Sequence, residues 1–153
     1  MRLVSELRHA IQEAKNSPNL RVLLFRSNTD NCFSSGADLK ERAVMSSSET
    51  EAFVDTLRDT FQQIEEIEVP TIAAIDGIAL GGGLELALAC DLRYAGPSFQ
   101  AGLVETKLGI LPAAGGSQRL PRLIGSSKAK ELVFRSQIIS PIEALEKGNN
   151  LSV

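Results

Sequence analysis

Glu85 is a carboxylate placed among apolar residues. It stands in the run Leu84-Glu85-Leu86-Ala87-Leu88-Ala89, and a helical wheel of this run puts apolar side chains on every side of it. A helix that is apolar all round is buried, and burial of a carboxylate is costly unless the group is paired or neutralised. Glu85 is therefore either a functional acid or base, or a partly solvated charge that interacts with the positive end of its helix.

Glu105 is the second candidate for acid–base chemistry. It lies in Gly102-Leu103-Val104-Glu105-Thr106-Lys107-Leu108-Gly109, which has the pattern of a loop between apolar neighbours. A single loop glutamate is usually exposed to solvent. Two carboxylates that reach one pocket, in contrast, can act as an acid and base pair. The spacing of Glu85 and Glu105 in the sequence leaves both interpretations open.

Three consecutive glycines, Gly81-Gly82-Gly83, precede the helix that we expect to begin near Leu84. Ten of the 12 glycines lie between Gly77 and Gly125, which indicates tight turns or a close approach of the backbone to another group. Free N–H groups at a helix start suit an anion, and donors aimed at a carbonyl oxygen form an oxyanion hole. Tight packing between strand and helix is the third interpretation. The glycine patterns of nucleotide-binding proteins are absent.

Serine hydrolysis and zinc binding fit the sequence poorly. Ser34 and Ser35 stand in a small-residue turn, but the Gly-x-Ser-x-Gly pattern is missing and the only histidine, His9, lies on the first predicted helix. Cys32, Cys90 and that histidine cannot supply the four ligands of a common Cys/His zinc site. We therefore expect no metal.

The elements that position these residues follow from short apolar runs that alternate with helical patterns. Residues 3–14 have the spacing of an amphipathic helix, and a second, long helix begins after the serines at 46–48 with a capping box and ends before Pro70. The predicted strands are 22–25, 71–75, 92–95 and 99–101, the first as a fully buried strand rather than an alternating edge strand. Residues 28–37 and 77–83 are predicted as turns, the chain after residue 101 as helical, and residues 148–153 as an end without a further element. This alternation predicts an α/β protein with a parallel sheet.

Composition excludes several classes of function. The 153 residues, 43% of them hydrophobic, are enough to build one domain with a core. A net charge of −3 with scattered basic residues does not suggest a nucleic-acid partner. The longest apolar stretch, residues 71–89, is interrupted by Asp76 and Glu85, so we expect no membrane span. The first residues lack the pattern of a signal or transit peptide.

Several motifs in a fixed order carry a resemblance. They are Phe33-Ser34-Ser35-Gly36-Ala37-Asp38-Leu39-Lys40-Glu41, Pro70-Thr71-Ile72-Ala73-Ala74-Ile75-Asp76-Gly77, Ala79-Leu80-Gly81-Gly82-Gly83-Leu84-Glu85-Leu86-Ala87, Cys90-Asp91, Gly102-Leu103-Val104-Glu105 and Gln118-Arg119-Leu120-Pro121-Arg122. Together they resemble the enoyl-CoA hydratase/isomerase (crotonase) family from about residue 3 to residue 147. The resemblance implies a single α/β domain over residues 1–153, built as a crotonase-like superhelix of repeated ββα units. The family's N-terminal hairpin and C-terminal helices are missing, so we expect a domain truncated at both ends.

The resemblance also implies a role for each candidate residue. In this family two backbone N–H groups, here those of Ala37 and Gly82, form the oxyanion hole for the thioester carbonyl. The family's hydratases use two glutamates, which match Glu85 and Glu105, to activate water and to protonate the α-carbon. The implied activity is therefore addition of water to a 2-enoyl-CoA. The further contacts that it implies with coenzyme A and substrate are Ser35, Ala37, Asp38, Gly81 and Ala113.

The partners follow from the same resemblance. It implies an acyl-CoA thioester substrate, no cofactor beyond the coenzyme A of that substrate, a trimer-based homo-oligomer, and a mitochondrial place in fatty-acid or branched-chain amino-acid breakdown. Two alternatives stay open. One is a truncated form that binds acyl-CoA or associates with longer subunits without turnover. The other is binding of AU-rich RNA, for which one family member uses a lysine-rich first helix. Here Arg2, Arg8 and Lys15 stand beside Glu6 and Glu13, which is typical of a solvated face.

Overall fold

Two parallel sheets form the centre of the fold. The computed structural model describes residues 2–148 and 151–152. The first sheet has the strand order β1 (Leu23–Arg26), β3 (Thr71–Ile75), β5 (Leu92–Ala95) and β7 (Leu151–Ser152). The second has the order β2 (Cys32–Ser34), β4 (Ile78–Leu80) and β6 (Gln100–Gly102). Neighbouring strands in both sheets run parallel, in agreement with the predicted α/β class.

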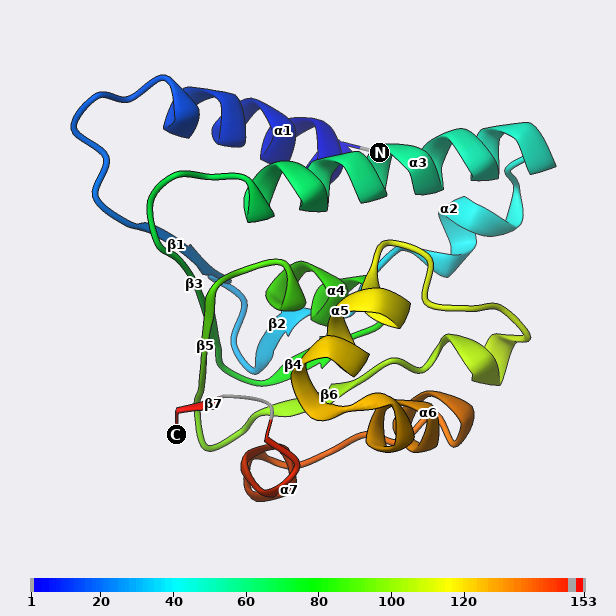
Figure 1. Ribbon diagram of the computed structural model, residues 1–153. Coiled ribbons are helices and arrows are strands. Elements are labelled where there is room, and N and C mark those ends of the chain that lie inside the picture. Colours follow the sequence, from blue (N-terminus) through cyan, green and yellow to red (C-terminus); the bar gives the residue numbers. More distant parts are fainter. Residues whose placement is uncertain (1, 149–150, 153) are drawn as a thin grey trace.

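The helices lie on opposite sides of these sheets. They are α1 (Arg2–Lys15), α2 (Leu39–Ala43), α3 (Ser47–Glu65), α4 (Gly82–Leu88), the 3-10 helix η1 (Glu105–Leu108), α5 (Gly116–Ile124), α6 (Ser126–Phe134) and α7 (Pro141–Glu146). The pair α1 and α3 runs along one side, α6 and α7 lie on the other, and α4 and α5 lie between them (Figure 1). Within the part of the chain that the structure describes, no helix is long and apolar enough to cross a membrane.

The chain repeats one unit as it winds. A strand of the first sheet is followed by a strand of the second sheet and then by helix: β1 and β2 precede α2 and α3, β3 and β4 precede α4, and β5 and β6 precede η1 and α5. Because each unit adds one strand to each sheet in parallel, the chain advances as a superhelix. The expected repeated ββα architecture is therefore confirmed.

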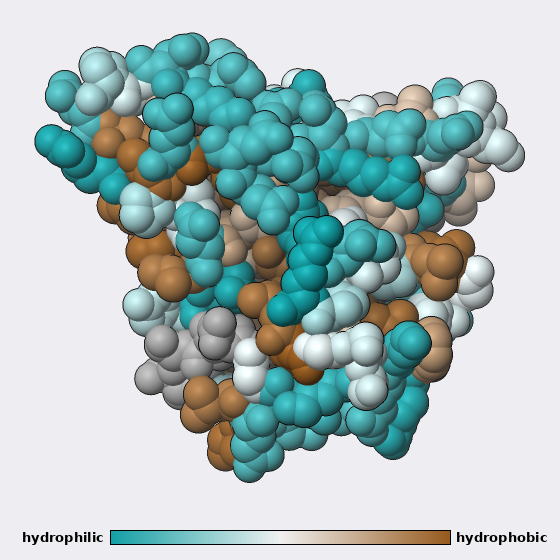
Figure 2. All heavy atoms as spheres, in the orientation of Figure 1, coloured by the Kyte–Doolittle hydropathy of each residue, from teal (hydrophilic) through white to brown (hydrophobic). Residues whose placement is uncertain are grey.

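The long helix α3 forms for the reasons its sequence suggests. Ser46 accepts a hydrogen bond from the backbone N–H of Glu49, whose side chain in turn accepts one from the backbone N–H of Ser46, so the predicted capping box is present. Its buried face carries Phe53, Phe61 and Ile64. Hydrophilic residues cover the outer side of the α1 and α3 pair, with apolar residues gathered beneath it (Figure 2). The pair therefore covers one side of the core.

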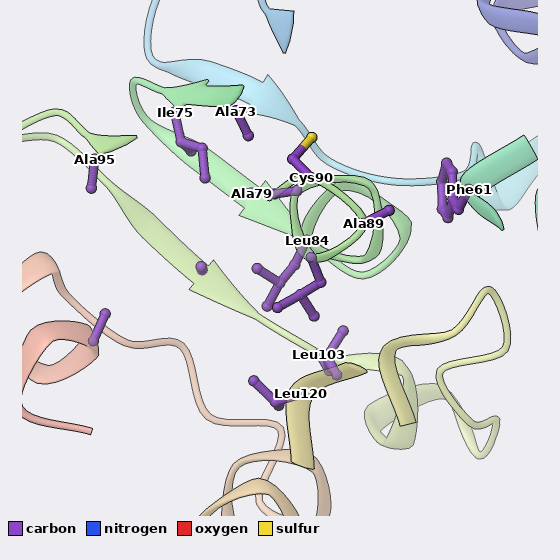
Figure 3. Packing of buried hydrophobic residues seen from close by; sticks show 14 of the residues in the cluster. Phe61, Ala73, Ile75, Ala79, Leu84, Ala89, Cys90, Ala95, Leu103 and Leu120 are labelled. Carbon is purple, nitrogen blue, oxygen red and sulfur yellow. The ribbon is translucent and has the colours of Figure 1, made fainter. Parts of the chain in front are cut away.

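Helix α4 lies at the centre of that core. Ala73 and Ala79 from the strands, together with Ala87 of the helix, are completely buried. Ala79 lies beside α4 (Figure 3), and such small side chains let α4 approach the second sheet closely. Leu103 and Leu120 close the opposite side of the same cluster. The closest approach is at Gly83, where a Cβ atom would lie 2.1 Å from the carbonyl oxygen of Ser34 on β2.

Four predicted details are wrong. Residues 28–37 and 77–83, predicted as turns, contain β2 and β4, which are too short to show a strand pattern. Strand β1 is an edge strand that leaves Leu24 half-exposed, because an apolar run does not reveal whether both faces are covered. Helix α4 begins at Gly82 rather than near Leu84.

The fourth concerns the C-terminal residues. Leu151 and Ser152 form β7 and pair with Arg93 and Tyr94 of β5, where no further element was expected. Residues 149, 150 and 153 lie outside the described residues.

Candidate active site

The backbone nitrogens of Ala37 and Gly82 lie on two segments that come close together. A Cβ atom at Gly82 would lie 3.9 Å from the nitrogen of Ala37, and one at Gly36 would lie 3.1 Å from the nitrogen of Gly82. Gly82 is the first residue of α4, so its N–H has no acceptor within the helix. No described residue accepts a hydrogen bond from the N–H of Ala37. Two neighbouring donors are thus available to a ligand.

Glycine makes this arrangement possible on both segments. Gly36 has φ +88° and Gly81, the N-cap of α4, has φ +52° and ψ −125°. These are backbone conformations that residues with a side chain rarely adopt. In addition, a Cβ atom at Gly36 would lie 3.0 Å from the carbonyl oxygen of Leu80. The β2–α2 loop and the start of α4 therefore approach each other through positions that require glycine.

Glu85 is 3% exposed and projects from the first turn of α4. Its Oε1 accepts hydrogen bonds from the backbone N–H groups of Ala114 at 2.9 Å and Gly116 at 2.8 Å. Burial, with a smaller contribution from the nearby Glu105 carboxylate, raises the pKa of Glu85 to about 7, although the two amides and Arg119 oppose the rise. Both protonation states of Glu85 are therefore populated near neutral pH.

Glu105 begins η1, which follows β6, the neighbour of β4 in the second sheet, and it lines the same cavity as Glu85. Burial raises its pKa, while its own backbone N–H and the Arg42 guanidinium oppose the rise. Its Oε1 faces Gly81, where a Cβ atom would lie 3.0 Å away. Its Oε2 is buried and accepts no hydrogen bond from the described residues. Of the two interpretations that the sequence left open for Glu105, the structure favours a side chain in the pocket, because η1 turns it inward.

These groups line one cavity of about 120 Å³. It is lined by both glutamates and by Ala37 and Gly82, and its apolar walls include Phe53, Leu57 and Val104. A second cavity, of about 220 Å³, is lined by α1, α3 and the β2–α2 loop. The two cavities share lining residues at Gly36, Ala37, Phe53, Leu57 and Gly82. The pair of N–H groups therefore lies where the two cavities meet.

The structure brings together every residue that the sequence singled out for the site. The lining of the smaller cavity includes Ser35, Ala37, Gly81, Gly82, Glu85, Glu105 and Ala113. Asp38 lines the larger cavity instead. Its carboxylate caps α2 by accepting a hydrogen bond from the backbone N–H of Lys40 at 2.8 Å. That carboxylate thus fixes the loop that carries Ala37.

Sequence reasoning missed three contributors. The amides of Ala114 and Gly116 hold Glu85, although nothing in an apolar helical run indicates which backbone will reach its side chain. The pair Gly115-Gly116 was a visible signal of close approach. Arg42 on α2 places a cation in the cavity beside Glu105. Its position in a short polar helix gave no sign of this.

With this geometry established, comparison with known proteins identifies the family. Residues 1–150 match the family Enoyl-CoA hydratase/isomerase, and the chain belongs to it. It is 53% identical over 146 residues to the mitochondrial methylglutaconyl-CoA hydratase of Homo sapiens, covering 95% of this chain and 43% of the relative. It is also 53% identical over 145 residues to the mitochondrial enoyl-CoA hydratase domain-containing protein 2 of Mus musculus, covering 95% of this chain and 49% of that relative.

Solved structures agree with this assignment. An enoyl-CoA hydratase from Bacillus anthracis superimposes with a TM-score of 0.93 at 45% identity, covering 98% of this chain and 59% of that one. One from Geobacillus kaustophilus superimposes with a TM-score of 0.93 at 36% identity, covering 97% of this chain and 57% of that one. The chain thus spans about half the length of the curated relatives it matches. The expected crotonase fold is confirmed.

Proposed function

We propose that this chain carries the site of a hydratase, which adds water across the double bond of a 2-enoyl-CoA thioester. One observation carries the proposal: two carboxyl groups with raised pKa values share a cavity with the neighbouring backbone N–H groups of Ala37 and Gly82. Donors of this kind stabilise an oxyanion, and paired acids divide acid and base roles.

The oxyanion forms when the oxygen of water attacks the β-carbon. Electron density then moves through the double bond to the thioester oxygen, where the N–H groups of Ala37 and Gly82 would donate hydrogen bonds. A fixed donor in such a site typically lowers the barrier by about 3 kcal/mol. Because the two donors are held by separate glycine turns, they are in place before charge develops.

The two glutamates would move the protons. One takes a proton from the attacking water as its oxygen bonds to the β-carbon, and the other gives a proton to the α-carbon, so the product is a 3-hydroxyacyl thioester. Mutual repulsion of Glu85 and Glu105 favours a pair that holds a single proton, which is the state that this division of roles needs. We propose that the reaction needs no cofactor beyond the coenzyme A of the substrate.

We propose that the acyl group ends in a carboxylate. A relative at 53% identity is named methylglutaconyl-CoA hydratase, and a glutaconyl thioester carries a second, ionised carboxyl group. Arg42 supplies a cation in the cavity wall, otherwise rich in apolar residues such as Phe53, Val54 and Leu57. The larger cavity, which Asp38 and α1 border, would take the coenzyme A arm.

Location and partners are proposals of the same kind. Relatives named as mitochondrial support a mitochondrial location, where we propose a role in fatty-acid or branched-chain amino-acid breakdown. Exposed apolar side chains on α6 and α7 support a homo-oligomer, which we propose to be trimer-based. RNA is not favoured, because basic residues of α1 are paired with acids. Arg2 contacts Glu6 at 2.7 Å, and Arg8 contacts Asp59 at 2.6 Å.

Enoyl-thioester absorbance tests the proposal directly. The purified chain should remove the absorbance of a 2-enoyl-CoA. The absorbance should fall faster when the acyl group ends in a carboxylate than when it is uncharged and of equal length. Glu85→Gln and Glu105→Gln should each lower kcat by roughly 100-fold to 10,000-fold, because Gln can neither accept nor release the proton.

Glu131→Gln is the matched control. Glu131 pairs with Arg135 on the exposed side of α6 at 3.0 Å, so its loss should leave kcat unchanged. Absence of turnover on every enoyl-CoA would overturn the proposal. If calorimetry then still detected acyl-CoA binding, the non-catalytic alternative would replace it.

A further inference from the structure

We propose that Arg58 on α3 and Arg119 on α5 are positioning residues for Glu85. Their guanidinium groups fix the loop at residues 113–116, whose amides hold one carboxylate oxygen of Glu85 and leave the other for the cavity. The kinetic part of this inference rests on the proposed hydration, whereas the positioning itself does not.

The peptide unit between Ala113 and Ala114 is held at both of its ends. Arg58 Nε donates to the carbonyl oxygen of Ala113 at 2.6 Å. The N–H of the same peptide unit, that of Ala114, donates to Glu85 Oε1 at 2.9 Å. A cation on the carbonyl oxygen polarises the peptide group and strengthens its N–H as a donor. Arg58 therefore acts on Glu85 through a single peptide group.

Arg119 holds the next peptide unit. Its Nη1 donates to the carbonyl oxygen of Ala114 at 3.1 Å, and its Nη2 pairs with Glu65 Oε2 at 3.0 Å. The side chain of Arg119 is 8% exposed. Because Glu65 and Arg58 both belong to α3, this helix fixes the loop twice, once directly and once through Arg119.

Two glycines leave room for this arrangement. Gly115 has φ +110°, and a Cβ atom there would lie 2.0 Å from Arg119 Nη1. At Gly116 a Cβ atom would lie 2.9 Å from Glu85 Cγ. The loop is thus shaped to receive an arginine on one side and the glutamate on the other. This explains a Gly-Gly pair that the oxyanion site itself does not use.

Removal of either guanidinium should raise the pKa of Glu85. The two amides and Arg119 all lower that pKa against burial and against the repulsion from Glu105. Arg42 on α2 acts on Glu105 rather than on Glu85. A looser loop weakens both amide donors, so protonated Glu85 would persist to higher pH and its free oxygen would no longer be fixed toward the cavity.

Arg58→Met is the main test, made in the full chain. We expect kcat to fall about tenfold or more at neutral pH with little change in KM, because the reacting group is misplaced rather than substrate binding lost. The limb of the pH profile that reports Glu85 should move to higher pH. Arg58→Lys keeps a donor and a charge and should restore part of the rate. Arg119→Lys, chosen because Arg119 is buried, should move the profile in the same direction.

Arg122→Met is the matched control. Arg122 lines the same surface depression as Arg58 and Arg119 but makes no hydrogen bond to the loop within the described residues. Its loss removes an equal charge and should leave the pH profile and kcat unchanged. An equal shift in Arg122→Met would overturn the proposal, because general electrostatics would then explain the effect.

A double-mutant cycle separates this inference from the proposed function. The unfolding free energy of the wild type and of Arg58→Met is measured against pH, alone and with Glu85→Gln. We expect Arg58→Met to move the pH-dependent loss of stability upward only where Glu85 is present. An unchanged pH window in folded Arg58→Met would overturn the positioning role even in an active enzyme, and the expected window shift would support it even without turnover.

Discussion

Glu85 illustrates how one side chain can be fixed and reactive at once. Its Oε1 accepts two amide hydrogen bonds, so a proton on this group is favoured on Oε2. Burial keeps Glu85 partly protonated near neutral pH, while the two amide donors keep its ionised form accessible. At the residue scale, the balance between desolvation and two backbone donors is what makes this glutamate useful for chemistry.

The pKa of Glu85 leads to a prediction about stability. A carboxyl group with a pKa of 4.5 when unfolded and about 7 when folded binds more protons in the folded state between those pH values. Its contribution to stability is fully present below pH 4.5 and is lost as pH rises toward 7. Relative to Glu85→Gln, we expect the wild type to lose about 3 kcal/mol of unfolding free energy over this range. Urea unfolding at a series of pH values measures it.

Glu49 is the control with the opposite sign. Hydrogen bonds from Ser46 lower its pKa, so its contribution to stability is present at neutral pH and lost as pH falls. Glu49→Gln should therefore lose stability relative to the wild type at neutral pH and approach it in acid. A Glu85→Gln difference that did not change with pH would contradict the raised pKa of Glu85.

Helix α4 is the element on which the site depends. Its first residue, Gly82, supplies one of the two neighbouring N–H groups, and its first turn supplies Glu85. The far end is fixed by buried Arg93, whose Nη1 donates to the carbonyl oxygen of Cys90 at 2.6 Å. With only seven residues, this helix is too short to be stable by itself. Packing against the second sheet and the surrounding core therefore determines where its N-terminus lies.

Two neighbouring glycines of α4 should respond differently to alanine. A methyl group at Gly83 would meet the Ser34 carbonyl oxygen at 2.1 Å, so the helix would have to move away from β2. At Gly82 the nearest atoms, in Gly36 and Ala37, lie at ordinary contact distances of 3.7 and 3.9 Å. We expect Gly83→Ala to cost about 2 kcal/mol or more, and Gly82→Ala to change stability by less than about 1 kcal/mol. Thermal unfolding checks both, and equal effects would contradict the close packing at Gly83.

The whole molecule builds its site from segments far apart in the sequence. Four segments line the smaller cavity: the β2–α2 loop, the start of α4, η1 and the loop before α5. They meet because each ββα unit returns the chain to the same end of the two sheets. The pair of α1 and α3 completes the adjoining cavity. Each of these segments contributes at least one group, so the site exists only when several units have folded together.

Helices α6 and α7 form the side of the molecule on which we expect subunits to associate. Phe134, Ile142 and Leu145 on these helices are more than half exposed, as expected where another subunit would pack. Light scattering at rising concentration should give a mass above 16.4 kDa. Phe134→Asp should weaken this association, whereas Val44→Asp, at an exposed apolar residue near α2, should not. A single 16.4 kDa species at every concentration would contradict the proposed oligomer for this chain.

The sequence by itself determined the local structural features of this protein. The capping box at Ser46, the apolar run around Glu85 and the glycines at 81–83 each act through neighbours a few residues away, and such short-range physics can be predicted from the order of residues. The family motifs added the candidate residues, all of which line the two joined cavities. Strands β2 and β4 escaped prediction because three residues carry too little periodicity.

Only the tertiary structure decided which groups meet. No local pattern shows that the amides of Ala114 and Gly116 reach Glu85, that Arg58 holds the carbonyl of Ala113, or that Glu105 turns inward. These contacts join segments separated by many residues, and they form because parallel strands bring successive units into register. The sequence by itself supplies the glutamates and glycines of the site. The raised pKa of Glu85 and the proximity of the two N–H donors come from burial and packing that exist only in the folded chain.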